Sequence, residues 1–265
     1  MGFVTPSDPL TMMYKNLSKA LELDPNSANS YYVSAVISVW TEWNWEKAEK
    51  EFLRALELNP NNALCRVFYA HLLMSLKRTD EASVQRNLAL ELDPMRPFIL
   101  ALCAVVMIDE GDYQAAITQL EKAVSIRPDH YFALGILEIA YFLNEDYEQA
   151  FDIMKTFISL NLGEEFAIIA QKTFDEKGYF AVVELLIEAH EKASQDSYQP
   201  PLMLADLYMK ANNHDKALDW IEKGYEIHGP DMPYIATGIF PYAPLYGNPR
   251  FVVIIEKMNL PLPGD

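Results

Sequence analysis

The sequence has few of the residues from which metal centres and disulfide frameworks are built. Only two of its 265 residues are cysteines, Cys65 and Cys103, and they stand among apolar neighbours without C-x-x-C spacing. We expect both to be small buried hydrophobic residues in a reducing compartment, not disulfide partners or metal ligands. The five histidines are scattered and form no H-E-x-x-H motif, so the sequence predicts neither a metal site nor a cofactor.

Positive charge is also scarce. Lys and Arg total 21 against 38 Asp and Glu, which gives a formal net charge of −17. Such an acidic protein is poorly suited to neutralising the phosphates of a nucleic acid or an anionic membrane surface. We therefore expect no nucleic-acid and no membrane partner, but a basic or neutral protein.

Long apolar runs are absent as well. The longest, residues 98–108, is too short to span a bilayer, and no positively charged, apolar signal precedes the repeats described below. The sequence therefore predicts a cytoplasmic location. Hydrophobic residues make up 51% of the chain and aromatic residues 12%, which is ample for a folded core and argues against intrinsic disorder.

Catalytic motifs are missing too, since there is no Gly-rich phosphate loop and no G-x-S-x-G motif. The acidic run Asp109-Glu110-Gly111-Asp112 lacks the alternating ligands of a calcium loop and falls where a turn between helices is expected. We expect no enzyme. The alternative, an enzyme on an all-helical scaffold, requires a convergent polar pocket with strongly perturbed pKa values.

What the sequence does contain is one hexapeptide pattern written four times. Ala-Leu-Glu-Leu-Asp-Pro or a variant of it ends at intervals of 35, 34 and 34 residues, at Pro25, Pro60, Pro94 and Pro128. A fixed period of this length is typical of stacked supersecondary units. Alanines seven residues apart, about two helical turns, mark one face of a helix that the proline then ends: Ala48 and Ala55, Ala82 and Ala89, Ala116 and Ala123.

These repeats resemble the tetratricopeptide repeat family. The third fits best, with Gly111-Asp112-Tyr113 at the turn, Ala116 and Ala123 on the second helix and Pro128 at its end. The resemblance implies an all-α fold, a right-handed α-solenoid superhelix of about six helix-turn-helix repeats with a helical C-terminal cap. It also implies a non-catalytic scaffold for protein binding, whose partner depends on variable surface residues.

We expect residues 1–265 to form a single solenoid. Residues 1–27 hold a second helix, near Pro9 to Leu23, without a first, which suggests a fragment of a longer protein or a native capping helix. Residues 28–162 hold the well-matched repeats and residues 163–228 the degenerate ones. The proline-rich residues 229–265 form the C-terminal cap, with one helix near Pro249 to Met258.

The first full repeat is one residue longer than the others and has Trp40, Trp43 and Trp45 at its turn. These rings could stack on bases or sugars, but we favour a structural role in a widened turn, with their N–H groups near water. The repeats also resemble those of bacterial signalling and regulatory proteins, in which a DNA-binding, cyclase or kinase domain precedes the array. That resemblance implies the binding or sensing portion of a larger regulatory protein; a free-standing adaptor or self-associating scaffold is the alternative.

The family's ligand groove is lined by the first helix of each repeat. Its positions are mostly apolar in this sequence, and we expect a partner to contact Tyr32, Val36, Val67, His71, Met74, Phe98, Val105, Phe132, Ile139 and Phe142. Such a surface suits an apolar helix or an extended segment, from a partner protein, a second copy of the chain (a homodimer) or the chain's own tail. The alternative is that these residues pack on neighbouring helices.

Overall fold

The computed structural model describes residues 7–194 and 198–263 of the chain. Within these residues the structure consists of helices and their connections, without a strand, and no described helix is long and apolar enough to cross a membrane. In chain order the helices are α1 (Ser7–Leu23), α2 (Ala28–Ile37), the π-helix η1 (Ser38–Glu42), α3 (Trp45–Leu58), α4 (Ala63–Ser75), α5 (Thr79–Leu92), α6 (Pro97–Asp109), α7 (Tyr113–Ile126), α8 (Tyr131–Leu143), α9 (Tyr147–Leu162), α10 (Glu164–Lys177), α11 (Tyr179–Ala193), α12 (Pro201–Lys210), α13 (His214–Glu226), the 3₁₀ turns η2 (Met232–Tyr234) and η3 (Ala243–Leu245), and α14 (Pro249–Lys257).

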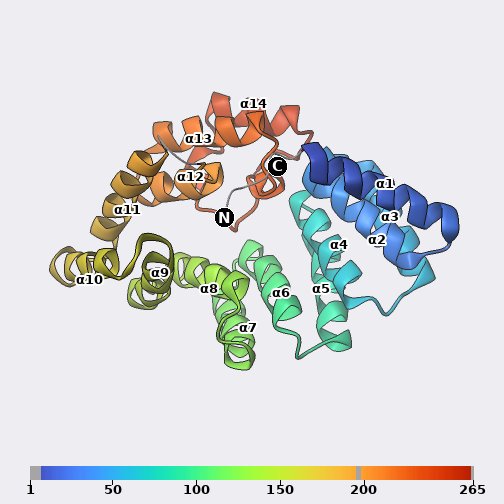
Figure 1. The fold of residues 1–265 in the computed structure, drawn as a ribbon, viewed down its shortest axis with the longest axis horizontal. Helices are drawn as coiled ribbons and strands as arrows, with labels where there is room; N and C mark the ends of the chain where they lie inside the picture. Colours follow the sequence, from blue (N-terminus) through green and yellow to red (C-terminus); the bar gives the residue numbers. More distant parts are fainter. Residues whose placement is uncertain (1–6, 195–197, 264–265) are drawn as a thin grey trace.

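Twelve of these helices form six consecutive pairs, from α2 and α3 to α12 and α13. The pairs follow one another around an oval, as Figure 1 shows, and α1 precedes them as a single helix. The predicted all-α solenoid of about six helix-turn-helix repeats is therefore confirmed.

The turns inside four of the pairs share one backbone conformation. The turn residue has a positive φ, +59° at Lys77, +79° at Gly111, +64° at Glu145 and +56° at Asn212, and the N–H of the next residue donates to the carbonyl five residues back. This Schellman-type arrangement satisfies carbonyls at the end of the first helix. In two of these pairs the side chain of Asp112 or Asn213 then caps the second helix, and Asn44 does the same in the first pair. Local sequence therefore dictates these turns.

The extra residue of the first repeat lies in the π-helix η1. Trp43, the turn residue of this repeat, follows the cap residue Ser27 by 16 residues, whereas Lys77 follows the cap residue Asn62 by 15. A π-helical turn adds a residue without ending the helix. One inserted residue thus accounts for the 35-residue interval.

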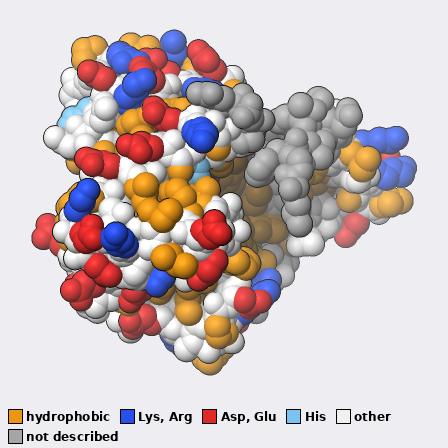
Figure 2. All heavy atoms as spheres, turned by 60° about the vertical axis from the view of Figure 1, so that its left-hand side comes forward, with side chains coloured by type: hydrophobic (Ala, Val, Ile, Leu, Met, Phe, Trp, Pro, Cys, Tyr) orange, Lys and Arg blue, Asp and Glu red, His pale blue; other side chains and the backbone are white. Residues whose placement is uncertain are grey.

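The pair α10 and α11 packs differently from the others. Both helices begin at a glycine of positive φ, Gly163 at +92° and Gly178 at +83°, and their apolar side chains belong to a cluster separate from the main core. Figure 2 brings this side of the molecule forward and shows apolar side chains among the charged ones. α10 itself leaves Ile168 64% exposed. It packs against α9 and α11, and it does not line the cavities of the inner face between α8 and α12 that the described residues leave.

Residues 229–247, here called the central segment, run from α13 across the concave face of the array (Figure 1). Six of their apolar side chains are buried in the main core with residues of α4, α6, α8 and α12: Met232, Ile235, Ala236, Ile239, Tyr242 and Leu245. A Cβ at Gly238 would lie 3.2 Å from the Cα of Asp109, so glycine allows this close approach to α6. The C-terminal region therefore fills part of the concave face.

Trp40, Trp43 and Trp45, here called the tryptophan cluster, join the two ends of the array. The indole N–H of Trp40 donates to Tyr234 Oη at 3.0 Å, and that of Trp45 to the carbonyl of Met258 at 2.8 Å. The ring of Trp43 stacks on His228, with ring centroids 3.9 Å apart. The rings thus pack within the chain. The expectation that their N–H groups lie near water is wrong. Residues distant in sequence accept the hydrogen bonds of Trp40 and Trp45, and the N–H of Trp43 is buried without a partner among the described residues.

Candidate functional site

The ten residues predicted to contact a partner differ widely in exposure in the structure. Four of them expose at most 2% of their surface: Val67, His71, Met74 and Val105. Phe132 is 40% exposed, and the other five are half-buried: Tyr32, Val36, Phe98, Ile139 and Phe142. The buried four pack against neighbouring helices or the central segment, so very little of their surface is open to a partner.

His71 makes the main polar contact between the first helices and the central segment. Its Nε2 lies 2.8 Å from the carbonyl oxygen of Leu102, and its Nδ1 lies 2.9 Å from Tyr234 Oη. Because a carbonyl only accepts, Nε2 carries the proton and Nδ1 accepts from the Tyr234 hydroxyl, which in turn accepts from Trp40. Burial lowers the pKa of His71 to about 4, so the ring is neutral.

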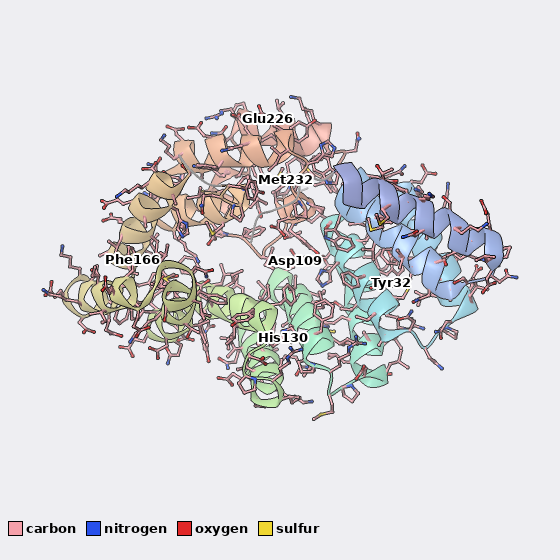
Figure 3. The ribbon with its side chains drawn as sticks, in the orientation of Figure 1. Tyr32, Asp109, His130, Phe166, Glu226 and Met232 are labelled. Carbon is pink, nitrogen blue, oxygen red and sulfur yellow. The ribbon has the colours of Figure 1, made fainter. Side chains whose placement is uncertain are left out.

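Asp109, at the end of α6, holds the central segment at a second point. Its Oδ1 accepts the N–H of Gly238 at 2.7 Å, and Figure 3 shows Asp109 and Met232 toward the middle of the molecule. Burial raises the pKa of Asp109, although this hydrogen bond opposes the shift. The acidic run that begins at Asp109 therefore contacts the central segment. No group of His, Cys, Asp and Glu in the described residues is arranged to hold a metal ion.

Between α8 and α12 the described residues leave part of the concave face unfilled. Two cavities of about 340 and 600 Å³ lie there and share four wall residues, Glu138, Pro200, Met203 and Asp206; together we call them the open groove. The smaller cavity is walled by α4, α6, α8, α12 and the central segment, and the larger by α8, α9, α11, α12 and the residues just before α12. Four of the ten predicted residues line the smaller cavity: His71, Val105, Phe132 and Ile139.

A buried ion cluster crosses the open groove and links α8 to α12. The ammonium of Lys210 lies 2.9 Å from Asp206 Oδ2 and 3.1 Å from Glu138 Oε1, and 4.6 Å from the centroid of the Phe142 ring. The Tyr179 hydroxyl donates to Glu138 Oε1 at 2.7 Å. Burial alone would lower the pKa of Lys210, but the two carboxylates outweigh it and raise this pKa well above its usual value. Lys210 is therefore charged.

Two polar groups near the cluster have no partner among the described residues. The Asp231 carboxylate reaches solvent in the smaller cavity and receives no hydrogen bond there, while the surrounding protein raises its pKa by desolvation. The Tyr242 hydroxyl is fully buried and unpaired. Burial raises the pKa of Tyr242, and the nearby charges of Asp206 and Asp231 add to the shift. A buried hydroxyl without a partner, such as that of Tyr242, is rare in folded proteins, whereas the exposed Asp231 carboxylate can bind water.

Comparison with known proteins identifies the repeats. A sequence model of the family described as Tetratricopeptide repeat matches residues 104–130 and 202–228, which contain the end of α6 and all of α7, and nearly all of α12 and all of α13. The chain contains tetratricopeptide repeats. No curated protein matches it.

Solved structures show the same fold. That of pilF from Pseudomonas aeruginosa is 17% identical to this chain, with a TM-score of 0.52 over 78% of this chain and 94% of that one. A chain of the APC/C hetero-tetramer Cut9-Hcn1 is 14% identical to this chain, with a TM-score of 0.52 over 94% of this chain and 40% of that one. At such identities the likeness concerns the fold alone.

The tetratricopeptide-repeat pattern indicated the inner face of the first helices, where Phe132 and Ile139 do lie, but it missed the ion cluster. A signal was present, because Glu138 is the only charged residue of the otherwise apolar α8, and Asp206 and Lys210 stand four apart in the mostly apolar α12. Charges in apolar helices indicate buried pairing. A pocket with perturbed pKa values, which an all-helical enzyme would need, is therefore present, but Lys210 pairs with two of its carboxylates.

Proposed function

We propose that the chain is a non-catalytic protein-interaction module that binds a segment of a partner protein in the open groove. The observation that carries this proposal is the pair of joined cavities, about 340 and 600 Å³, between α8 and α12. Their walls are largely apolar with a few polar groups, which is the usual composition of a binding site. Tetratricopeptide repeats act as scaffolds, and their specificity depends on surface residues such as these.

An apolar helix or an extended segment suits this groove. Phe132, Ile139 and Met203 in one cavity and Phe157 and Leu186 in the other offer spaced positions for apolar anchors. The rest of the concave face already accepts such a segment, because the central segment lies over α4 and α6 and buries its own apolar side chains there. A partner in the open groove would continue this arrangement toward α9 and α11.

We further propose that the module acts within a larger bacterial signalling or regulatory protein in the cytoplasm. The support is the resemblance of its repeats to those of such proteins. A free-standing adaptor, or a scaffold that binds a second copy of itself, is the alternative. Intact-mass measurement of the protein from its native cells separates the two: a polypeptide well above 30.3 kDa supports the larger protein, and one of this mass supports the adaptor.

A display library of random 12-residue peptides, selected on the purified chain, tests the binding proposal. Phe132→Asp places a charge in the groove wall, and because Phe132 is 40% exposed the carboxylate can remain hydrated in the folded protein. Tyr131→Asp is the matched control, because Tyr131 is 56% exposed on the same helix and lies outside both cavity walls.

We expect selected peptides to bind the native chain and Tyr131→Asp equally, and Phe132→Asp at least about ten-fold more weakly, since a buried anchor contact typically contributes more than about 1.4 kcal/mol. The three proteins should melt at similar temperatures. A library that yields no binder, or peptides that bind Phe132→Asp as tightly as the native chain, would contradict the proposal.

A further inference from the structure

Among the described residues, the open groove holds more negative than positive charge. Three described carboxylates line it, Glu138, Asp206 and Asp231, against one ammonium, that of Lys210. The one histidine of the smaller cavity, His71, is neutral. In a recess with mostly apolar walls the effective dielectric constant is lower than in water, so an unbalanced carboxylate attracts a cation more strongly than one on an open surface.

We propose that the smaller cavity binds the cationic side chain of a Lys or Arg in the partner segment, with the Asp231 carboxylate as its acceptor. This inference rests on the proposed function and narrows the partner to a segment in which a basic residue is flanked by apolar ones. The apolar neighbours occupy the groove on either side, along Met203 and toward the larger cavity.

Asp231 is the carboxylate available for this contact. Glu138 and Asp206 are already paired with Lys210, whereas no described residue donates to the Asp231 side chain. The backbone at Asp231 is held in place, because its carbonyl accepts the N–H of Tyr234, the last residue of the turn η2. A fixed acceptor loses little conformational entropy when it binds a donor.

Aromatic rings complete the setting for a cation. Phe132, Tyr234 and Phe240 line the same cavity as Asp231, and ring faces attract ammonium and guanidinium groups while the aliphatic stem of Lys or Arg packs on apolar surface. The chain holds its own Lys210 in this way, between two carboxylates and 4.6 Å from the centroid of the Phe142 ring.

Peptides from the display selection test the inference on the intact chain. We expect them to be enriched in Lys or Arg beside Leu, Phe or Met. In each, Lys is replaced by norleucine and Arg by citrulline, which keep the stem and remove the charge, and Kd is measured by calorimetry. Asp231→Asn removes the acceptor charge without leaving a buried partner unpaired. Asp175→Asn, at an exposed position of α10, removes the same charge from the outer face.

Asp231→Asn should weaken binding of the basic peptides by about ten-fold or more, as the loss of a charged hydrogen bond does, and should leave the neutral peptides within about two-fold. Asp175→Asn should change neither. The inference is overturned if selected peptides lack basic residues, if the neutral analogues bind as tightly, or if Asp175→Asn has the effect of Asp231→Asn. If the inference fails but the peptides still bind Phe132→Asp more weakly than the native chain, the proposed function stands. If the peptides bind Phe132→Asp and the native chain equally, both the inference and the proposed function are contradicted.

Discussion

At the scale of single residues, His71 illustrates how a polar side chain can be accommodated in an apolar core. Both ring nitrogens have a partner, and a relay runs from the Trp40 N–H through the Tyr234 hydroxyl to Nδ1. A protonated ring would lose the hydrogen bond from Tyr234, because both nitrogens would then donate. The neutral state of His71 is therefore part of the contact that holds the central segment.

His71 should make the protein less stable in mild acid. Its pKa is about 4 in the folded protein and about 6.5 as a free side chain, so the unfolded chain takes up a proton first as the pH falls, and stability is lost between about pH 6.5 and 4. From pH 7 to 4.5 this amounts to about 2 kcal/mol. Urea unfolding at pH 7 and 4.5 measures this loss of unfolding free energy. The loss should be smaller by that amount in His71→Gln than in the native chain.

The carboxylates provide the internal check on this result. Burial raises the pKa of Asp109, Asp206 and Asp231, so they act in the opposite direction and stabilise the folded chain as the pH falls. Their contribution is present in both proteins and cancels in the comparison. His214→Gln, at the start of α13, is the control substitution. If the stability of His71→Gln depended on pH as that of the native chain does, His71 would not be the cause of the loss in mild acid.

At the scale of elements, the π-helix η1 and the tryptophan cluster beside it are the most consequential departure from the regular repeat. The insertion lengthens the first helix of this repeat before its turn, and the rings of the cluster contact Tyr225, His228, Tyr234 and Met258. A regular solenoid repeat contacts only its neighbours. Here the first full repeat also binds the last helices and the central segment.

Trp45→Phe should loosen this contact. The substitution leaves the Met258 carbonyl without its donor and opens a small cavity, which should cost about 2–4 kcal/mol of the free energy of unfolding. Hydrogen exchange should become faster in residues 229–258 and change little in α10 and α11. Trp220→Phe, in α13 beside Lys223, is the control. If hydrogen exchange of residues 229–258 were equally fast in both variants, the contact between Trp45 and Met258 would not be a main support of the C-terminal region.

At the scale of the whole molecule, the array is closed on itself. One apolar core contains Trp45 and Phe52 of the first repeat, Ile221 of the last, and Tyr242 and Ile255 of the C-terminal region. Contacts between segments about 200 residues apart couple the ends of the chain, for example Trp45 and Met258. We therefore expect more cooperative unfolding than in an open solenoid, whose stability is a sum of local terms.

Removal of residues 229–265 should break this cooperativity. In the native chain, urea transitions followed by far-ultraviolet circular dichroism and by tryptophan fluorescence should coincide, whereas in the shortened chain the fluorescence transition should come at lower urea and the helical signal should fall over a broader range. Three of the four tryptophans lie in the tryptophan cluster, so fluorescence reports the closure. Coincident transitions with an unchanged midpoint in the shortened chain would contradict a closed array.

Much of the fold was predictable because its signals are short-range. The repeat interval, the Schellman-type turns at Lys77 and Gly111 and the small residues at Ala48 and Ala82 depend on side chains within about one helical turn or one helix pair. The candidate site was predictable only in part. Phe132 and Val105 occupy the same predicted face, yet one is 40% and the other 2% exposed, because Val105 lies under contacts that no local pattern encodes.

The sequence by itself determined that this chain is a stack of helix pairs, since helix periodicity, caps and turns are written within each repeat. It also contained the inserted residue of the first repeat, whose consequence could not be seen locally. Only the tertiary structure decided that the central segment covers α4 and α6, that the described residues leave cavities between α8 and α12, and that Lys210 pairs with Glu138 and Asp206 but not with Asp231. These outcomes depend on contacts between residues distant in sequence, which form only when the whole array has closed.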